Sequence, residues 1–189
     1  MKKLLLAACI LGLTACASTD KTEAPIGPEP VPTSIALGEM SNEQASYALY
    51  NTLVKSNYLV DKIGANRIAI QFGDQEFVLE VSRNQDGIDR ILANRFYAVH
   101  PQLHGSQELL LAIGSLNQKL NFAKFLVREN GAVIQVQSSM TFVNGFELEE
   151  LRRFMLWTDE GLRQVGDSFP ERSQELIKPL PIMQHPTSE

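Results

Sequence analysis

The sequence predicts a single α/β domain of the α+β type, in which helices pack on one mainly antiparallel sheet. Two kinds of pattern predict it. Apolar residues recur at helical spacing in three segments, and they alternate with polar residues in several others. Turn-forming pairs such as Asn-Gly separate the alternating segments, as they do in β-hairpins. The expected order of elements is α-β-β-β-α-β-β-α.

Composition limits the classes of function. The chain has 189 residues, of which 44% are hydrophobic and 21% charged, and this fits one ordinary globular domain. Its formal net charge is −5. Because nucleic-acid binding needs a basic face, we expect no nucleic acid among its partners.

The first residues are typical of a secretory signal. Lys2 and Lys3 precede an apolar run from Leu4 to Leu13. A helix of this length spans only about 15 Å, whereas a bilayer core is about 30 Å thick. The run is therefore too short to cross a membrane as a helix.

The end of the apolar run and the three residues after it resemble the lipobox of bacterial lipoproteins. They read Leu13-Thr14-Ala15-Cys16. The resemblance implies cleavage between Ala15 and Cys16 and attachment of a diacylglycerol to Cys16. Ala17, in place of an aspartate, then favours the outer membrane, with the domain facing the periplasm. The alternative is an ordinary secretory signal followed by a chance cysteine.

Proline content and apolar content divide the chain into four segments. We expect a signal peptide over residues 1–15 and a lipidated, proline-rich tether over 16–40. The folded domain is expected over 41–166 and a proline-rich tail over 167–189. The stretch from Leu176 to Met183 is apolar enough to dock on the domain. Cys9 leaves with the signal and Cys16 carries lipid, so the mature chain has no free thiol.

Three segments show the spacing and end signals of helices. Ser41 and Gln44 form a capping-box start for the first. Ser106 is the expected N-cap of the second, in which Gly114 is expected to allow close packing against the sheet. The third is expected to begin near Asn144. Apolar positions of the second helix are Leu109, Ile113, Leu116 and Leu120.

Two hairpins are predicted with their register. A turn at Gly73-Asp74 sets Ile70 opposite Phe77. A type I′ turn at Asn130-Gly131 sets two further pairs opposite each other. A third strand is expected within Arg90 to Val99, although Ile88 to Phe96 also fits a short helix. The pairs at the second turn are Val127 with Ile134 and Phe125 with Val136.

The order of elements resembles the YbjN-domain family, whose fold is that of the type III secretion chaperones. The resemblance covers about residues 41–165 and is strongest from Leu116 onward. It implies an adaptor- or chaperone-like module, often paired, with no established enzymatic activity. The matching parts are Leu116 to Asn121, Phe122 to Phe125, Asn130-Gly131, Ile134 to Met140, Gly145 and Leu148 to Trp157.

The histidines do not form a recognisable metal motif. His100, His104 and Glu108 are spaced by four residues, which on a helix would place them on one face. A proline and a glycine interrupt the segment, so this geometry fails. His185 lies far along the chain. We therefore predict no metal site and no cofactor.

No catalytic residue is predicted either. The sequence lacks the Gly-x-Ser-x-Gly pattern of a nucleophile elbow. Glu147, Glu149 and Glu150 lie where a helix begins, and that position explains them without catalysis. Glu76 and Glu80 share one face of a strand and are expected to face solvent.

Three aromatic residues are the candidate contacts with a partner. They are Phe146, Phe154 and Trp157, at or near the last helix. The apolar face of this helix is broader than one contact with a sheet requires, which raises the hypothesis of a homodimer.

The expected function is that of a membrane-anchored, periplasm-facing lipoprotein whose non-catalytic domain binds a protein partner through an apolar patch. Two alternatives stay open. A carrier of a small apolar ligand or lipid would need a pocket of about 300 Å³ or more. A hydrolase would need a histidine within hydrogen-bond reach of a serine or a carboxylate in a cleft.

Overall fold

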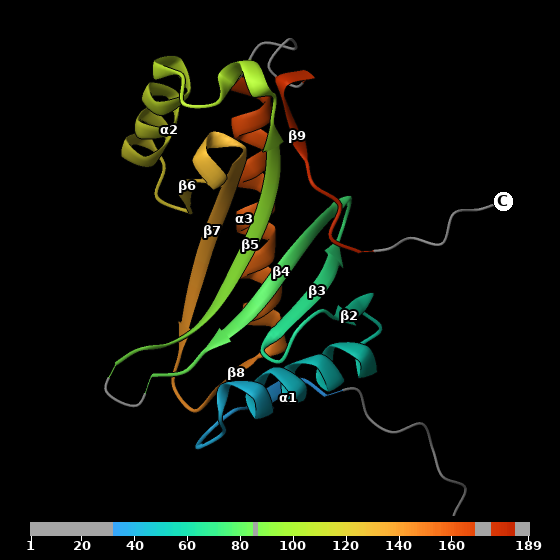
Figure 1. Cartoon of the computed structure of the whole chain (residues 1–189). Coiled ribbons are helices and arrows are strands. Elements are labelled where there is room, and N and C mark those ends of the chain that lie inside the picture. The colour runs from blue at the N-terminus through green and yellow to red at the C-terminus, as the bar shows by residue number, and fades with distance from the viewer. Residues whose placement is uncertain (1–31, 85–86, 169–174, 184–189) are drawn as a thin grey trace, which may run out of the picture. The chain divides into compact units, whose positions relative to one another are not determined.

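A computed structural model gives the arrangement of the helices and strands (Figure 1). The structure describes residues 32–84, 87–168 and 175–183. The predicted signal peptide, its cleavage site after Ala15 and the lipid-bearing Cys16 lie outside the described residues. No helix in the described ranges is both long enough and apolar enough to cross a membrane.

The described part of the chain contains every helix and strand that the sequence predicts, together with four short strands that it does not. The additional strands are β1, β2, β8 and β9. The helices are α1 (Asn42–Lys55), α2 (Gln107–Lys119) and α3 (Leu148–Ser168), with short 3-10 turns η1 (Pro101–Leu103) and η2 (Glu129–Gly131). The strands are β1 (Ser34–Ala36), β2 (Val60–Lys62), β3 (Arg67–Phe72), β4 (Gln75–Ser82), β5 (Asp89–Val99), β6 (Lys124–Arg128), β7 (Val133–Phe142), β8 (Gly145–Glu147) and β9 (Ile177–Pro179).

The strands form two sheets, and all their pairings are antiparallel. The larger sheet has the order β2-β3-β4-β5-β7-β6, with β9 paired to the end of β5 beyond β4. β1 and β8 form a separate two-stranded sheet. The predicted α+β class with a mainly antiparallel sheet is confirmed. The third predicted strand is β5, and the helical alternative for that segment is wrong.

Both predicted hairpins have the predicted register. Ile70 lies opposite Phe77, and the β6–β7 pairs are those expected from a turn at Asn130-Gly131. Asn130 has φ 54° and ψ 31°, and Gly131 has φ 100°. These angles suit a type I′ turn, whose two central residues both need a positive φ.

One face of the larger sheet carries the core. Alternate side chains of the central strands point to this face, and apolar residues of all three helices pack with them. In Figure 1, α3 runs behind the sheet and α2 lies beside the β6–β7 hairpin. Members of this core include Leu49 of α1, Phe77 of β4, Ile91 of β5, Ile113 of α2 and Met155 of α3.

The fold begins earlier than the predicted boundary at residue 41. Ser34–Ala36 forms β1, and Ile35 and Leu37 are buried. The partner strand β8 occupies the place where the last helix was predicted to begin, so α3 begins at Leu148. Gly145 is required there, because a Cβ atom would overlap the carbonyl oxygen of Ile35.

The fold also continues past the predicted end at residue 166. The predicted docking stretch in the tail contains β9, which pairs with residues 97–99 of β5. Beyond β9, one carboxylate oxygen of Glu76 accepts the backbone N–H groups of Ile182 at 2.6 Å and Met183 at 3.2 Å. Met183 is buried. This part of the tail therefore belongs to the domain.

Candidate functional site

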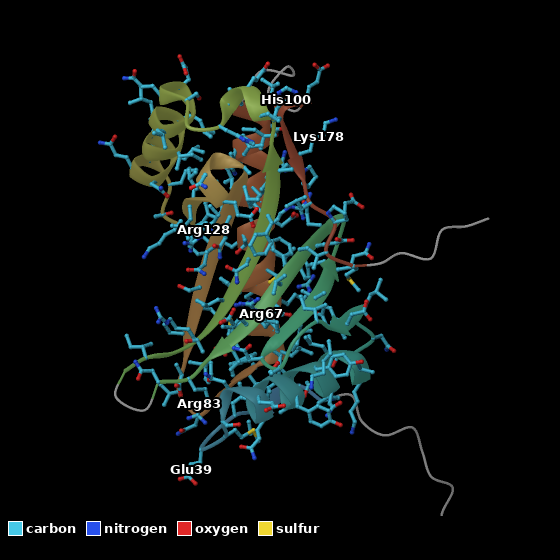
Figure 2. The ribbon with its side chains drawn as sticks, in the orientation of Figure 1. Glu39, Arg67, Arg83, His100, Arg128 and Lys178 are labelled. Atoms are coloured by element: carbon cyan, nitrogen blue, oxygen red, sulfur yellow. The ribbon has the colours of Figure 1, made fainter. Side chains whose placement is uncertain are left out.

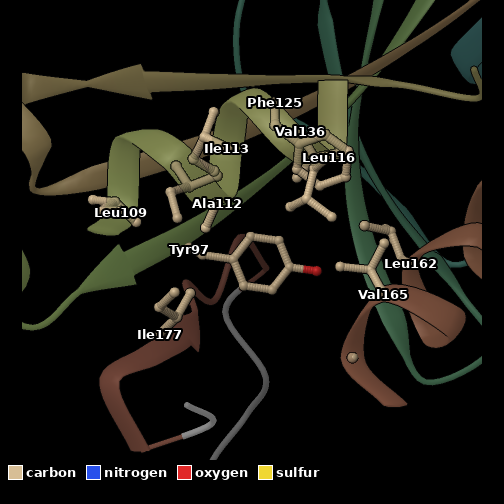
Figure 3. Close-up of a pocket in the computed structure, with 12 residues that line it drawn as sticks. Tyr97, Leu109, Ala112, Ile113, Leu116, Phe125, Val136, Leu162, Val165 and Ile177 are labelled. Atoms are coloured by element: carbon tan, nitrogen blue, oxygen red, sulfur yellow. The ribbon is translucent and has the colours of Figure 1, made fainter. Parts of the chain in front are cut away.

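An apolar pocket of about 150 Å³ lies between α2, the C-terminal part of α3, the sheet and β9 (Figure 3). It is partly open to solvent. Tyr97 is the one lining residue with a polar side chain, and its hydroxyl points toward Leu162 and Val165. The lining residues are Leu109, Ala112, Ile113 and Leu116 of α2, Tyr97, Phe125, Ile134 and Val136 of the sheet, Leu162, Val165 and Gly166 of α3, and Ile177 of β9.

Helix α2 forms one wall because its apolar positions repeat at helical spacing. Its first turn is fixed by Ser106, whose hydroxyl accepts the N–H of Leu109 at 3.1 Å. The opposite side of α2 has no cover in the described residues, and Leu111 there is 65% exposed. The helix therefore presents an apolar inner face to the pocket and two exposed leucines, Leu110 and Leu111, elsewhere on its surface.

The last turn of α2 is attached to β6 by the side chain of Asn117. Its Nδ2 donates to the carbonyl oxygen of Phe125, and its Oδ1 accepts the N–H of Phe125, each at 2.8 Å. Asn117 thus occupies both backbone groups of one residue on the last strand of the sheet. It lies in the asparagine-containing helix end that carries the family resemblance, although the sequence assigned no role to it.

A row of aromatic rings connects the pocket with the surface. Phe125 contacts Phe122 edge-on at 6.2 Å between ring centroids, and Phe122 contacts Trp157 in the same way at 6.3 Å. Gly161 makes room for this row, because a Cβ atom there would lie 2.7 Å from the ring of Phe122. Trp157 is 50% exposed, so one part of its ring is free to contact another molecule while the ring stays packed against Phe122.

The other two predicted partner contacts are in the interior. Phe146 and Phe154 are each only 7% exposed. Phe146 packs against Phe142 with a centroid distance of 5.5 Å, and it lies in β8, where it is paired with Ile35 of β1. Both side chains are therefore buried, which corrects the expectation that they are exposed on the surface. For Phe146 the cause is the pairing of β1 with β8, which the sequence interpretation lacked.

A buried guanidinium borders the pocket behind Tyr97. Arg95 donates from Nη1 to the carbonyl oxygen of Glu76 at 3.1 Å, and its charge lies 5.5 Å from the ring centre of Tyr97. Its Nε has no hydrogen-bond partner among the described residues. Burial raises the pKa of Tyr97, and the neighbouring Arg95 charge opposes this shift. The phenol therefore stays neutral at physiological pH.

One carboxylate lies close enough to sense this charge. Burial raises the pKa of Asp159, and the charges of Glu160 and Asp74 add to the effect, while Arg95 opposes it. No ion pair joins Asp159 to Arg95 in the described structure. Arg95 therefore acts on Tyr97 and Asp159 through its charge.

The histidines are engaged with the local backbone. His100 accepts the N–H of Gln102 at Nδ1, at 3.4 Å. His104 contacts the carbonyl oxygen of Val99 through Nε2 at 2.9 Å. Within residues 32–84, 87–168 and 175–183, no group of three or more His, Cys, Asp or Glu side chains is placed to hold a metal. His185 lies outside the described residues.

The acidic residues near the start of α3 have structural partners. The carboxylate of Glu150 accepts the N–H of Glu147 at 3.0 Å, and Glu149 pairs with Arg152 and Arg153 at 3.4 and 3.3 Å. This is the arrangement expected at a helix N-terminus.

Comparison with known proteins connects this architecture to one solved structure. No protein-family profile matches the sequence, and no curated protein matches it. The chain is similar to the crystal structure of YbjN, described as a candidate transcription regulator from E. coli, with a TM-score of 0.51. The two sequences are 15% identical, and the match covers 70% of this chain and 95% of that chain. The chain has a YbjN-like fold.

The YbjN-like fold supports the sequence-based resemblance at the level of architecture. It covers most of the described domain. At 15% identity the likeness is one of fold alone, so the residues that act in this protein are argued from its own geometry.

Proposed function

We propose that this protein is an outer-membrane lipoprotein, anchored through lipid on Cys16, whose YbjN-like domain faces the periplasm and binds a protein partner without catalysis. The observation that carries the binding role is the partly open pocket between α2 and α3, with Tyr97 as its one polar lining residue. Binding of an apolar group in such a pocket is favourable because it removes the group from water.

The size of the pocket favours a side chain over a whole ligand. Pockets for drug-sized molecules and cofactors measure roughly 300–1,000 Å³, and this one measures about 150 Å³. An engineered cavity of about that volume, lined by Leu, Ile and Phe, takes up benzene. One leucine, methionine or phenylalanine side chain of a partner fits this volume, and single buried anchors of this kind dominate many interfaces.

The absence of a catalytic role is supported by how the polar side chains are used. Both described histidines contact backbone groups. The carboxylates at the start of α3 bind their own helix and its arginines. The hydrolase alternative needs a histidine beside a serine or carboxylate in the pocket, and the lining residues include none of these.

The anchor is tested by changing Cys16 to Ala. The wild-type protein should fractionate with outer membranes and incorporate labelled palmitate, while the variant should appear in the soluble periplasmic fraction without label. A variant that stays with membranes would overturn the anchor, and label that persists would assign the acyl group to another residue.

The pocket is tested by photo-crosslinking in intact cell envelopes. A crosslinking amino acid replaces Gly166, which lines the pocket and where an added Cβ atom would have nothing within 4 Å. The change Ala112→Leu, which fills the pocket, should abolish the crosslinked product. A crosslinker at Leu111, outside the pocket, is the matched control. Products at Gly166 that survive Ala112→Leu would contradict binding in the pocket.

A carrier role would give a different result in native mass spectrometry. Protein purified from envelopes would then hold an added organic mass that Ala112→Leu removes. We expect no such mass, because the pocket is smaller than a lipid.

A second copy of the chain is one candidate partner. Leu156 and Trp157 are adjacent on α3 and both exposed. Sedimentation of the Cys16→Ala protein tests this: a dimer that Trp157→Ala dissociates supports it, and a monomer at tens of micromolar contradicts it.

A further inference from the structure

The end of the sheet farthest from the pocket carries two exposed aliphatic side chains. Ile88 is 61% exposed and Val143 is 84% exposed. They follow the last pair between β5 and β7, which is Asp89 with Phe142, and so occupy the next cross-strand positions. They therefore form one apolar tip made by two chain segments. We call these residues, Ile88 and Val143, the apolar tip.

The apolar tip lies above a tight turn and two buried aromatic rings. The N–H of Gly145 donates to the carbonyl oxygen of Val143 at 2.7 Å, and Asn144 has φ 60°. This tight turn directs Val143 outward. Below it, the packed rings of Phe142 and Phe146 are buried. The backbone conformation of this turn therefore keeps the side chain of Val143 exposed.

The chain that leads to Cys16 enters the domain through β1, which starts beside Leu148 of α3 and runs toward the apolar tip. The N–H of Leu37 donates to the carbonyl oxygen of Asn144, the residue after Val143, at 2.8 Å. In Figure 2, Glu39 and Arg83 mark this end, and His100 and Lys178 mark the opposite one. A lipid on Cys16 would therefore tether the domain through β1, the strand that ends beside the turn of Val143.

Charge at the apolar tip also suits a bilayer surface. Arg83 neutralises Asp89 at 3.2 Å and donates to the carbonyl oxygens of Leu37 and Met40. Arg90, the second residue of β5, is exposed two residues after Ile88. Aliphatic side chains beside a basic residue are favourable at the boundary between head groups and acyl chains.

We propose that the apolar tip inserts into the surface of the bilayer that holds the lipid anchor. This inference rests on the proposed anchor at Cys16. The tether keeps the domain at high local concentration near the membrane, so two side chains suffice to orient it. Glu39 is exposed in a neighbouring turn and balances the charge of Arg90, so we expect insertion to occur in neutral lipid through apolar contact.

This orientation also places the pocket. Tyr97 lies eight residues along β5 from Asp89, and at about 3.3 Å per residue the strand carries it roughly 26 Å from Asp89, the residue next to the tip. The pocket then faces the aqueous compartment, where a partner can reach it.

The test uses the lipidated full-length protein in vesicles. Val143→Cys is labelled with a fluorophore, and Leu111→Cys, on α2 near the pocket, is the matched control. Vesicles of phosphatidylethanolamine and phosphatidylcholine contain a nitroxide quencher at head-group depth. We expect quenching at position 143 to be several-fold stronger than at position 111. Ile88→Asp in the chain labelled at 143 should reduce it to the level of the control.

Two results would overturn the inference in different ways. Equal quenching at both positions, in protein that floats with the vesicles, refutes insertion of the apolar tip and leaves the anchor standing. Labelling of the protein without an introduced cysteine shows a free thiol at Cys16, and this refutes the anchor together with the orientation that rests on it. Quenching that appears only after phosphatidylglycerol is added to the vesicles would contradict the apolar contact.

Discussion

The side chain of Asn117 is expected to be the most sensitive polar contact around the pocket. Its two hydrogen bonds to Phe125 are both 2.8 Å long and partly buried. The change Asn117→Ala removes both of them while leaving the apolar wall of α2 in place. The end of α2 then loses its attachment to β6.

The size of the effect follows from the contacts. Each hydrogen bond contributes about 1 kcal/mol net, so the pair contributes about 2 kcal/mol. Alanine is a better helix former than asparagine by up to about 0.7 kcal/mol, which offsets part of the loss. We expect the free energy of unfolding to fall by about 1.5 kcal/mol.

Urea unfolding of the Cys16→Ala protein measures this change, with the fluorescence of Trp157, the one tryptophan of the chain, as the probe. Gln118→Ala is the matched control, because Gln118 is the next residue of α2 and is exposed. It should change stability by less than about 0.5 kcal/mol. Equal unfolding midpoints for the two variants would refute the role assigned to Asn117.

Three further predictions follow from single positions. Gly161→Ala drives a Cβ atom to 2.7 Å from the ring of Phe122 and should cost about 1–3 kcal/mol in urea unfolding, whereas Gly114→Ala has open space and should stabilise the protein. Burial raises the pKa of Asp159 above its ordinary value of 3.8. The native state therefore holds the carboxyl proton more tightly than the unfolded state does. The free energy of unfolding should fall as pH rises from 3.8 through the raised pKa. Asp159→Asn should lack this loss, and parallel pH profiles for both proteins would contradict the assignment. Glu76→Ala should speed amide exchange in residues 182–183 with little effect on global unfolding, and unchanged exchange would exclude the carboxylate as their anchor.

Local patterns predicted the central part of the fold. The hairpin at Asn130-Gly131 was predictable because the turn type, the alternation and the matching apolar pairs all agree on one register. Ser106 marked the start of α2 because a side-chain cap acts within one turn of helix. Such signals involve residues that are close in sequence.

The missed features join segments that are distant in sequence. β1 and β8 pair three residues each across more than a hundred positions, and neither is long enough to show a period. This pairing buries Phe146, which sequence alone assigned to the surface. The pocket escaped prediction for the same reason, since α2, α3 and β9 each supply only one wall.

Glycines show the limit of local reasoning in another way. Gly114 was expected to permit close packing, yet nothing lies within 4 Å of its missing side chain. Close packing instead occurs at Gly161, because the ring of Phe122 packs against this position from outside the helix. The sequence shows where a glycine lies in a helix, but it does not show whether another part of the chain packs against that position.

The side-chain amide of Asn117 also occupies backbone groups on the edge strand of the sheet. β6 is the final strand on its side, and the outermost strand of a sheet is a template for growth by further chains. At Phe125 the amide takes the place that a neighbouring strand would occupy. In molecules crowded on one membrane as proposed, this contact opposes the addition of a neighbouring strand at Phe125.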